Sequence, residues 1–433
     1  MKIFSAPRGV AVPAVSDLQL ILYGQPDRHA DGARSVGSAG AAIETRIQRL
    51  RYAPAPRAWD FLSLALSVVV ADLSVHRAGS PDGWTRQIDL ITAVGEPDFW
   101  NSEAHTIEAA LRFLSTDLWT LEFVGEGRRP DPPDELFRPT EDSVCLLSGG
   151  MDSLIGAIDL AESGRRSIAV SNTVPGDGHN QHSFAEAVGF KHLPLNHNAS
   201  PPSDGSREPS QRARSIIFLA FGVLAATSLQ AYQDGAQVPL FICENGFIAL
   251  NPPLTGTRLG SLSTRTAHPE FLHGVQSVLD AAGLRVNLIN PYQHKTKGEM
   301  SRECADQDLL RNLAASSVSC GRYRRYGYNQ CGRCIPCQIR RSAYLAWGQP
   351  DPTDYVFKDI GRREADYAHF DDVRSVAMAI SRVNSEGLEA WLRSALSYPH
   401  AGPRAPLRDV VIPPPISRRQ KWNFLVPFPE EVP

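Results

Sequence analysis

Short, continuous apolar runs alternate along the chain with stretches of helical spacing, most clearly in its middle third. The four apolar residues at 144–147 are typical of a buried parallel strand. Apolar positions then recur at helical spacing, at Leu154, Ile155, Ile158 and Ala161. Gly164 is suited to end that helix, and a second strand is predicted at 167–171. The segment therefore predicts one β–α–β unit.

The residues before this unit show a different pattern. We expect residues 1–125 to form an N-terminal α+β or mostly β domain. Strand-like runs lie at 18–23, 61–75, 87–91 and 119–124, and helical spacing covers 104–115. Residues 126–141 contain four prolines among charged residues and are predicted to be a linker.

Residues 142–346 are predicted to form the α/β domain. Further strands are expected at 238–243 and 285–290, and further helices from Gln211, at 269–282 and from Thr296. The apolar run 216–229 is shorter than the ~20 residues of a membrane span, so we predict a buried helix. Residues 347–433 are expected to form a helical extension, at 373–396, and a proline-rich tail that wraps the surface or a partner.

Composition limits the function classes. The 433 residues carry a net charge of −3, which gives no overall field to attract nucleic acid or an anionic membrane. The N-terminus lacks the apolar core of a signal peptide. Of the seven cysteines, four are clustered, which fits metal binding in a reducing compartment better than disulfides. We therefore expect a cytoplasmic protein.

The residues after the strand at 144–147 suggest a phosphate site. Gly149 and Gly150 allow an anion to approach the backbone N–H groups at the start of the next helix. Ser148 and Ser153 add hydroxyl donors, and Asp152 suggests a bridging Mg²⁺. Neither the P-loop pattern nor the dinucleotide pattern is present. The alternative is a small-residue turn in an ordinary α/β sheet.

Cys320, Cys331, Cys334 and Cys337 have the spacing C-x10-C-x2-C-x2-C. Four thiolates on tight turns match tetrahedral Zn²⁺ in a closed structural site. An iron–sulfur cluster would use similar ligands and stays an alternative.

The segment Ser148-Gly149-Gly150-Met151-Asp152-Ser153 resembles the signature of the PP-loop ATP pyrophosphatases, which cleave ATP between its α- and β-phosphates. This segment resembles 7-cyano-7-deazaguanine synthase, QueC, when it is taken with three later features. These are Ser319-Cys320, the cysteine motif that ends at Cys337, and the following Arg340 and Arg341. Two more segments, Arg214 to Leu219 and Thr296-Lys297, are similar to sequence motifs of that family. The resemblance covers about residues 143–346.

This resemblance implies a Rossmann-like PP-loop sheet (adenine nucleotide alpha hydrolase fold) that uses ATP, Mg²⁺ and Zn²⁺. It implies an ATP-dependent ligase that adenylates a 7-carboxy-7-deazaguanine-like acid and then forms an amide. Asp152, Lys297 and Arg214 are the implied catalytic residues. The implied nucleotide-binding residues are Ser148, Gly149, Gly150, Met151, Asp152, Ser153, Ser171 and Asn172.

One departure bears on the substrate. The synthase has a Tyr-Pro-Asp-Cys-Arg-like word after its fourth strand, whereas this chain has Glu244-Asn245-Gly246. We predict substrate contacts from Glu244, Asn245, Arg265 and His268. The altered pocket and longer chain resemble QatC-type proteins of antiphage defence, which predicts a partner protein from the same operon as the amine acceptor.

Three other functions stay open at this point. They are a 7-cyano-7-deazaguanine synthase that uses ammonia, a tRNA-modifying PP-loop enzyme, and a nucleotide-sensing subunit. The stretch 322–328 mixes arginines with tyrosines and is compatible with nucleic-acid binding. We favour the interpretation that its charges offset the thiolates and phosphates nearby.

Overall fold

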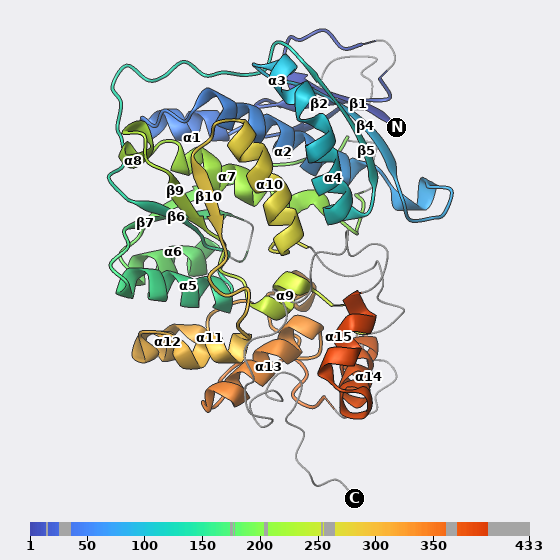
Figure 1. The fold of residues 1–433 in the computed structure, drawn as a ribbon, viewed down its shortest axis with the longest axis vertical. Coiled ribbons are helices and arrows are strands. Elements are labelled where there is room, and N and C mark those ends of the chain that lie inside the picture. The colour runs from blue at the N-terminus through green and yellow to red at the C-terminus, as the bar shows by residue number, and fades with distance from the viewer. Residues whose placement is uncertain are drawn as a thin grey trace, which may run out of the picture.

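The computed structural model describes residues 1–13, 16–25, 36–173, 176, 178–202, 207–252, 254, 265–360 and 370–396. Its centre is a pair of five-stranded parallel sheets (Figure 1). The first sheet has the order β3-β2-β1-β4-β5, with strands β1 (Lys2–Pro7), β2 (Leu18–Leu22), β3 (Val36–Ala39), β4 (Gln87–Ala93) and β5 (Leu118–Val124). The second has the order β10-β9-β6-β7-β8, with strands β6 (Ser143–Leu146), β7 (Ser167–Asn172), β8 (Lys191–Leu195), β9 (Val238–Phe241) and β10 (Val286–Ile289).

Helices follow most of the strands. Those of the N-terminal part are α1 (Ile43–Arg49), α2 (Pro56–Ser74), α3 (Pro97–Ser102) and α4 (Ala104–Ser115). Those around the second sheet are α5 (Met151–Glu162), α6 (Gly178–Ala187), α7 (Ile216–Ala226), α8 (Gln230–Gln233), α9 (Gly246–Leu250) and α10 (Pro269–Ala281). The last group is α11 (Lys297–Glu303), α12 (Gln307–Ala314), α13 (Ile335–Trp347), α14 (Phe370–Glu386) and α15 (Leu388–Leu396). Short 3-10 helices include η1 (Arg77–Gly79), η2 (Ala213–Ser215) and η4 (Tyr323–Tyr326).

The N-terminal part is itself an α/β unit, so the prediction of an α+β or mostly β domain is wrong. All of its described strands pair in parallel. The run 61–75, predicted as a strand, lies almost wholly in helix α2. Sixteen consecutive residues of α2, from Ala58 to Leu73, are buried. Because this helix is covered on all sides, its sequence lacks the polar face that marks an amphipathic helix.

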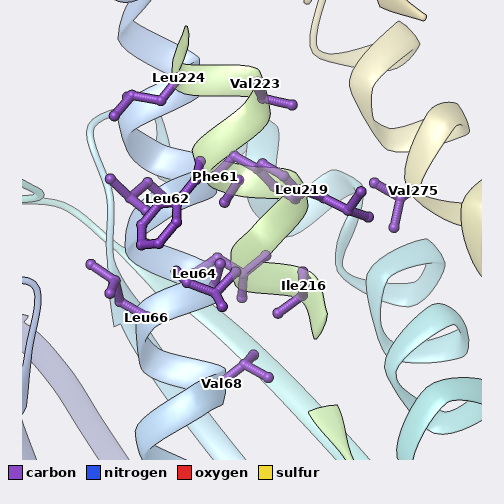
Figure 2. Packing of buried hydrophobic residues seen from close by; sticks show 14 of the residues in the cluster. Phe61, Leu62, Leu64, Leu66, Val68, Ile216, Leu219, Val223, Leu224 and Val275 are labelled. Atoms are coloured by element: carbon purple, nitrogen blue, oxygen red, sulfur yellow. The ribbon is translucent and has the colours of Figure 1, made fainter. Parts of the chain in front are cut away.

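Two helix layers lie between the sheets and join them in one apolar core. α2 packs against α7, and α4 packs against α10. Figure 2 shows Phe61 and Leu64 of α2 beside Leu219 of α7, with Val275 of α10 close by. The two central helices run antiparallel, since the N–H before α2 (Ala55) bonds Thr227 after α7, and Asp72 near the end of α2 bonds the N–H of Ala213. The predicted buried helix at 216–229 is thereby confirmed as α7.

The second sheet confirms the predicted β–α–β unit of β6, α5 and β7. The strands that follow β6 in the chain extend the sheet to one side through β7 and β8, and to the other through β9 and β10. The order therefore reverses between β6 and β9, and open α/β sheets bind ligands at the carboxyl ends of the strands at such a point.

The C-terminal helices α14 and α15 confirm the predicted helical extension, and they pack on α13 and on Leu254 (Figure 1). The proline-rich tail at 397–433 lies outside the described residues. Residues 126–141, predicted to be a linker, contain no helix or strand. None of the helices described here is both long and apolar enough to span a membrane.

Candidate functional site

The loop between β6 and α5 lies at the switch point of the second sheet. Gly149 has a φ of +83°, a conformation that residues with a Cβ rarely adopt. Gly150 is extended and forms the N-cap of the 12-residue helix α5. The turn thus directs the N-terminal N–H groups of α5, and the positive end of its dipole, to the carboxyl edge of the sheet.

Two hydroxyl groups lie within this loop. The Oγ atoms of Ser148 and Ser153 are 3.1 Å apart, and the Gly150 N–H donates to Ser148 Oγ at 3.3 Å. Ser153 Oγ also donates to the Gly150 carbonyl at 3.0 Å. These contacts hold the donors together at one point, which is the arrangement that an anion needs.

Asp152 lies next to this loop and is 5% exposed. Its Oδ1 is 2.7 Å from Nζ of Lys297, and its Oδ2 accepts a hydrogen bond of 2.7 Å from Nδ2 of Asn245. Lys297 is the first residue of α11, whose start is fixed by a capping box between Thr296 and Glu299. The predicted residues Asp152 and Lys297 therefore come together as a buried ion pair.

Glu244 lies on the other side of Asp152. Burial and the charge of Asp152 raise the pKa of Glu244 to about 8, while the charge of Lys297 opposes the shift. The Glu244 side chain is therefore largely protonated at neutral pH. Asn245 is the N-cap of α9, and its Oδ1 accepts from the N–H of Ile248. Both polar ends of the Asn245 amide are thus used within the chain, so Asn245 positions Asp152.

The other predicted residues lie elsewhere. Arg214 is an exposed residue of η2, and its charge adds to the burial that lowers the pKa of His197 to about 4. Arg265 donates to the carbonyl of Phe113 at 2.8 Å. The ring of His268 lies 4.7 Å from that of Phe113, and its Nδ1 accepts from the N–H of Glu270. Arg265 and His268 therefore contact α4 of the N-terminal part.

Ser171 and Asn172 end β7 beside the loop. The Ser171 hydroxyl donates to the carbonyl of Leu147 at 2.6 Å and contacts Nε2 of His192 at 3.0 Å. The sequence gave no reason to select Gln181 of α6, whose Nε2 bonds the carbonyls of Ser148 and Asn172 at 3.4 and 3.3 Å. Gln181 belongs to none of the sequence motifs described above, and only the fold places it beside the loop.

The four cysteines form the second part of the site. Their ligand atoms all lie within 4.8 Å of one another, and all four residues are buried. The Sγ atoms of Cys331 and Cys337 are 3.9 Å apart, and those of Cys334 and Cys320 are 3.8 Å apart. Four sulfurs about 2.3 Å from a central Zn²⁺ would be about 3.8 Å apart. The geometry therefore fits a tetrahedral metal site, as the spacing predicted.

The segment before Cys320 connects this cluster to the phosphate loop. The N–H of Val318 donates to the carbonyl of Gly149 at 2.9 Å, and Asn180 donates to the carbonyl of Ser316 at 2.7 Å. Arg340, fully buried on α13, bonds Ser317 and Ala314. The cysteine cluster thus anchors one wall of the phosphate loop.

These features define an α/β protein with a glycine-containing loop at a strand switch point and, beside it, a cluster of four buried cysteines that could hold a metal ion. No protein-family model matches the chain. Over part of its length it is distantly homologous to 7-cyano-7-deazaguanine synthases.

The synthase of Paracoccus denitrificans is 35% identical over 98 residues, which is 22% of this chain and 40% of that enzyme. Synthase 1 of Sphingopyxis alaskensis is 26% identical over 244 residues, covering 49% of this chain and 97% of that enzyme. The enzyme of Thiobacillus denitrificans is 32% identical over 94 residues, again 40% of its length. The homology implies a PP-loop fold for the second sheet and supports an enzyme. It does not extend to QatC-type proteins, which none of these relatives represents.

Proposed function

We propose that this chain is an ATP-dependent enzyme that activates the carboxylate of a 7-deazaguanine-type acid as its adenylate and transfers the acyl group to an amine. The loop of Ser148, Gly149 and Gly150, with Asp152 and Lys297 at its end, is the observation that supports this most strongly. The distant homology to enzymes named 7-cyano-7-deazaguanine synthase supports the choice of substrate class.

The loop and its surroundings fit a nucleotide. The hydroxyls of Ser148 and Ser153 and the N–H groups that open α5 would hold pyrophosphate oxygens. Among the residues that the structure describes, the buried Oδ1 of Asn172 and Oε1 of Gln181 have no hydrogen-bond partner, and such acceptors match the amino group of an adenine base. Mg²⁺, when bound, would neutralise phosphate charge, and the carboxylate of Asp152 is the group suited to hold it.

The first step joins the substrate carboxylate oxygen to the α-phosphorus and breaks the bond from that phosphorus to the bridging oxygen. Pyrophosphate leaves with the electron pair. Lys297 is placed to neutralise the charge that develops on it, because its ammonium group lies at the end of the loop. In the second step the amine nitrogen attacks the acyl carbon, AMP leaves, and the amine loses its proton to solvent. The chain contributes mainly positioning and charge stabilisation.

The amine is proposed to belong to a partner protein in an antiphage defence system. The proposal is supported by Glu244-Asn245-Gly246 in place of the synthase word, and by the N-terminal sheet added ahead of the PP-loop sheet. The four cysteines are proposed to hold a structural Zn²⁺, since all four are buried.

The test incubates the purified chain with ATP, Mg²⁺, 7-carboxy-7-deazaguanine and an ammonium salt that supplies ammonia as the amine, and measures AMP and pyrophosphate. We expect AMP that depends on the acid, and none with 7-cyano-7-deazaguanine, which has no carboxylate to activate. Asp152→Asn and Lys297→Met should each lower the rate by about 100-fold or more, as removal of a single transition-state donor does. Product formation unchanged in both variants would contradict the proposed site. Intact-mass measurement of co-expressed neighbouring proteins then separates a protein adduct from a free nitrile or amide.

A further inference from the structure

Arg212 is a buried arginine for which the described residues provide no direct anionic partner. It directly precedes η2, is 6% exposed, and lies on the ring of Trp84 with its Cζ 4.6 Å from the ring centroid. Its Nη2 is buried and has no hydrogen-bond partner in the segments that the structure describes. Among the residues that the structure describes, no hydrogen bond or ion pair reaches its guanidinium group. A guanidinium stays charged when buried, so its counter-charge is missing.

The two carboxylates whose charges act on Arg212, those of Asp117 and Asp72, are used by other arginines. Asp117 forms a two-point contact with Arg77, at 2.8 and 3.0 Å, and also accepts from Arg86 at 2.6 Å. Asp72 accepts from Arg86 and from the N–H of Ala213.

Arg212 pairs with none of the carboxylates described in this region. Asp72 and Asp117 pair with Arg77 and Arg86, and the buried Glu208 accepts from the N–H groups of Arg77 and Ser210. Burial, together with the charges of Arg77 and Arg265, lowers the pKa of Arg212 to about 10. The charges of Asp117 and Asp72 oppose this shift, and the group is still cationic at neutral pH.

A second unpartnered donor lies on the same side of the chain. The Oγ of Ser215 is buried and has no hydrogen-bond partner within the described part of the chain. Ser215 ends η2, three residues after Arg212, and side chains three residues apart eclipse one another on a 3-10 helix. The guanidinium and the hydroxyl therefore project to one side, next to the N-terminus of the 11-residue helix α7.

We propose that Arg212 and Ser215 bind an anionic group, a phosphate or a carboxylate, of a ligand that docks where the N-terminal sheet unit meets the second sheet. The planar guanidinium suits both groups, because each offers two oxygens to its N–H fork. The site is carried by η2 and the residue before it, whereas the phosphate loop is carried by β6 and α5. Arg212 belongs instead to the segment that contacts the N-terminal part, where Glu208 accepts from the N–H of Arg77.

The experiment measures the melting temperature of the full chain against inorganic phosphate and, separately, acetate, with ionic strength held constant by sodium chloride. We expect at least one anion to raise the melting temperature of the wild type saturably. The response should persist in Lys297→Met, which alters the phosphate loop, and disappear in Arg212→Met. Without the anion, Arg212→Met should melt no lower than the wild type, because methionine keeps the packing on Trp84 and removes the unpaired charge.

Two further variants keep the test decisive if Arg212→Met does not fold. Ser215→Ala removes a hydroxyl that has no partner among the described residues, so it should fold normally. It should raise the Kd for the anion by about 5- to 10-fold, the effect of one lost hydrogen bond. Arg311→Met, at an exposed arginine paired with Asp308, is the control and should leave the Kd unchanged.

The two anions separate the ligand classes, since a response to phosphate alone indicates a phosphate ester and a response to acetate alone indicates a carboxylate. The proposal is overturned if neither anion shifts the wild type. It is also overturned if the response survives in Arg212→Met and is lost in Lys297→Met, because the anion would then occupy the phosphate loop.

Discussion

Replacement of Arg340 by methionine tests whether the cysteine cluster supports the phosphate loop. Arg340 is fully buried on α13, three residues after Cys337. Its Nη1 donates to the Oγ and carbonyl of Ser317 at 2.7 and 3.2 Å, and its Nη2 donates to the carbonyl of Ala314 at 2.6 Å. Nε donates to Oγ1 of Thr353 at 2.9 Å.

The magnitude follows from the acceptors that lose their donor. The Ser317 carbonyl keeps one bond, from Nε2 of Gln330, whereas the Ala314 carbonyl loses a short bond from a charged donor. Each buried group that loses its partner costs about 1–3 kcal/mol, and these costs are not fully additive. We expect the free energy of unfolding to fall by about 4 kcal/mol, and the melting temperature by about 8 °C, at about 2 °C per kcal/mol for a large domain.

Activity should fall as well, because residues 316–318 contact Gly149 and Asn180 of the loop region. We expect AMP formation to drop by about 10-fold or more, as a misplacement of about 1 Å commonly produces. Scanning calorimetry and the AMP assay measure the two effects. The melting temperature and AMP formation of Arg340→Lys should lie between those of the wild type and Arg340→Met. A lysine ammonium group can replace one of the hydrogen bonds but not the several that the guanidinium group donates at once.

The exposed Arg311→Met provides the control and should melt within about 2 °C of the wild type, because surface ion pairs contribute about 0–1 kcal/mol. The zinc content of Arg340→Met should remain at the wild-type level, since all four cysteines are intact. A normal melting temperature together with normal AMP formation in Arg340→Met would refute the argument.

Three more predictions concern other parts of the chain. Cys331→Ser should lose its bound zinc, measured by elemental analysis, because three thiolates bind the ion more weakly; full retention would contradict the assigned site. Gly156→Ala should lower the free energy of unfolding by about 1–3 kcal/mol in urea, since its Cβ would lie 2.3 Å from Sγ of Cys243, while Gly79→Ala, in open space, should not. Burial, with the charge of His182, lowers the pKa of His192 to about 4. The unfolded state, with its pKa near 6.5, therefore binds more protons in this range, so stability should fall as pH drops from about 6.5 to 4, less steeply in His192→Gln.

The second sheet was largely predictable because its strands are short apolar runs bounded by clear turn residues. The start of α11 at Thr296 was also predicted, and a capping box now explains it. The missed strand β8 carries lysine, histidine and proline in five residues, which weakens any strand pattern. Helix α2 was missed for the opposite reason, since it has no polar face at all.

The candidate site was predictable where chemistry is local and not where it depends on the fold. The spacing of Cys331, Cys334 and Cys337 places them on one turn and the following helix, so the sequence alone indicated the metal site. The contact of Lys297 with Asp152 joins residues far apart in the chain, and only family resemblance pointed to it. Nothing in the sequence distinguished Arg212 from an exposed arginine, because its burial depends on Trp84 from the other sheet unit.

The packing of α2 on α7 has a consequence for how the chain can be divided. Ten of the eleven residues of α7 are buried, partly by α2, although α7 belongs to the second sheet and α2 to the first. A fragment limited to 142–346 would expose the large apolar surface of α7 that α2 normally covers, and it should aggregate when expressed alone. Co-expression of residues 1–141 as a separate polypeptide should restore the soluble yield of this fragment. The two parts therefore depend on each other for folding, although a single chain segment connects them.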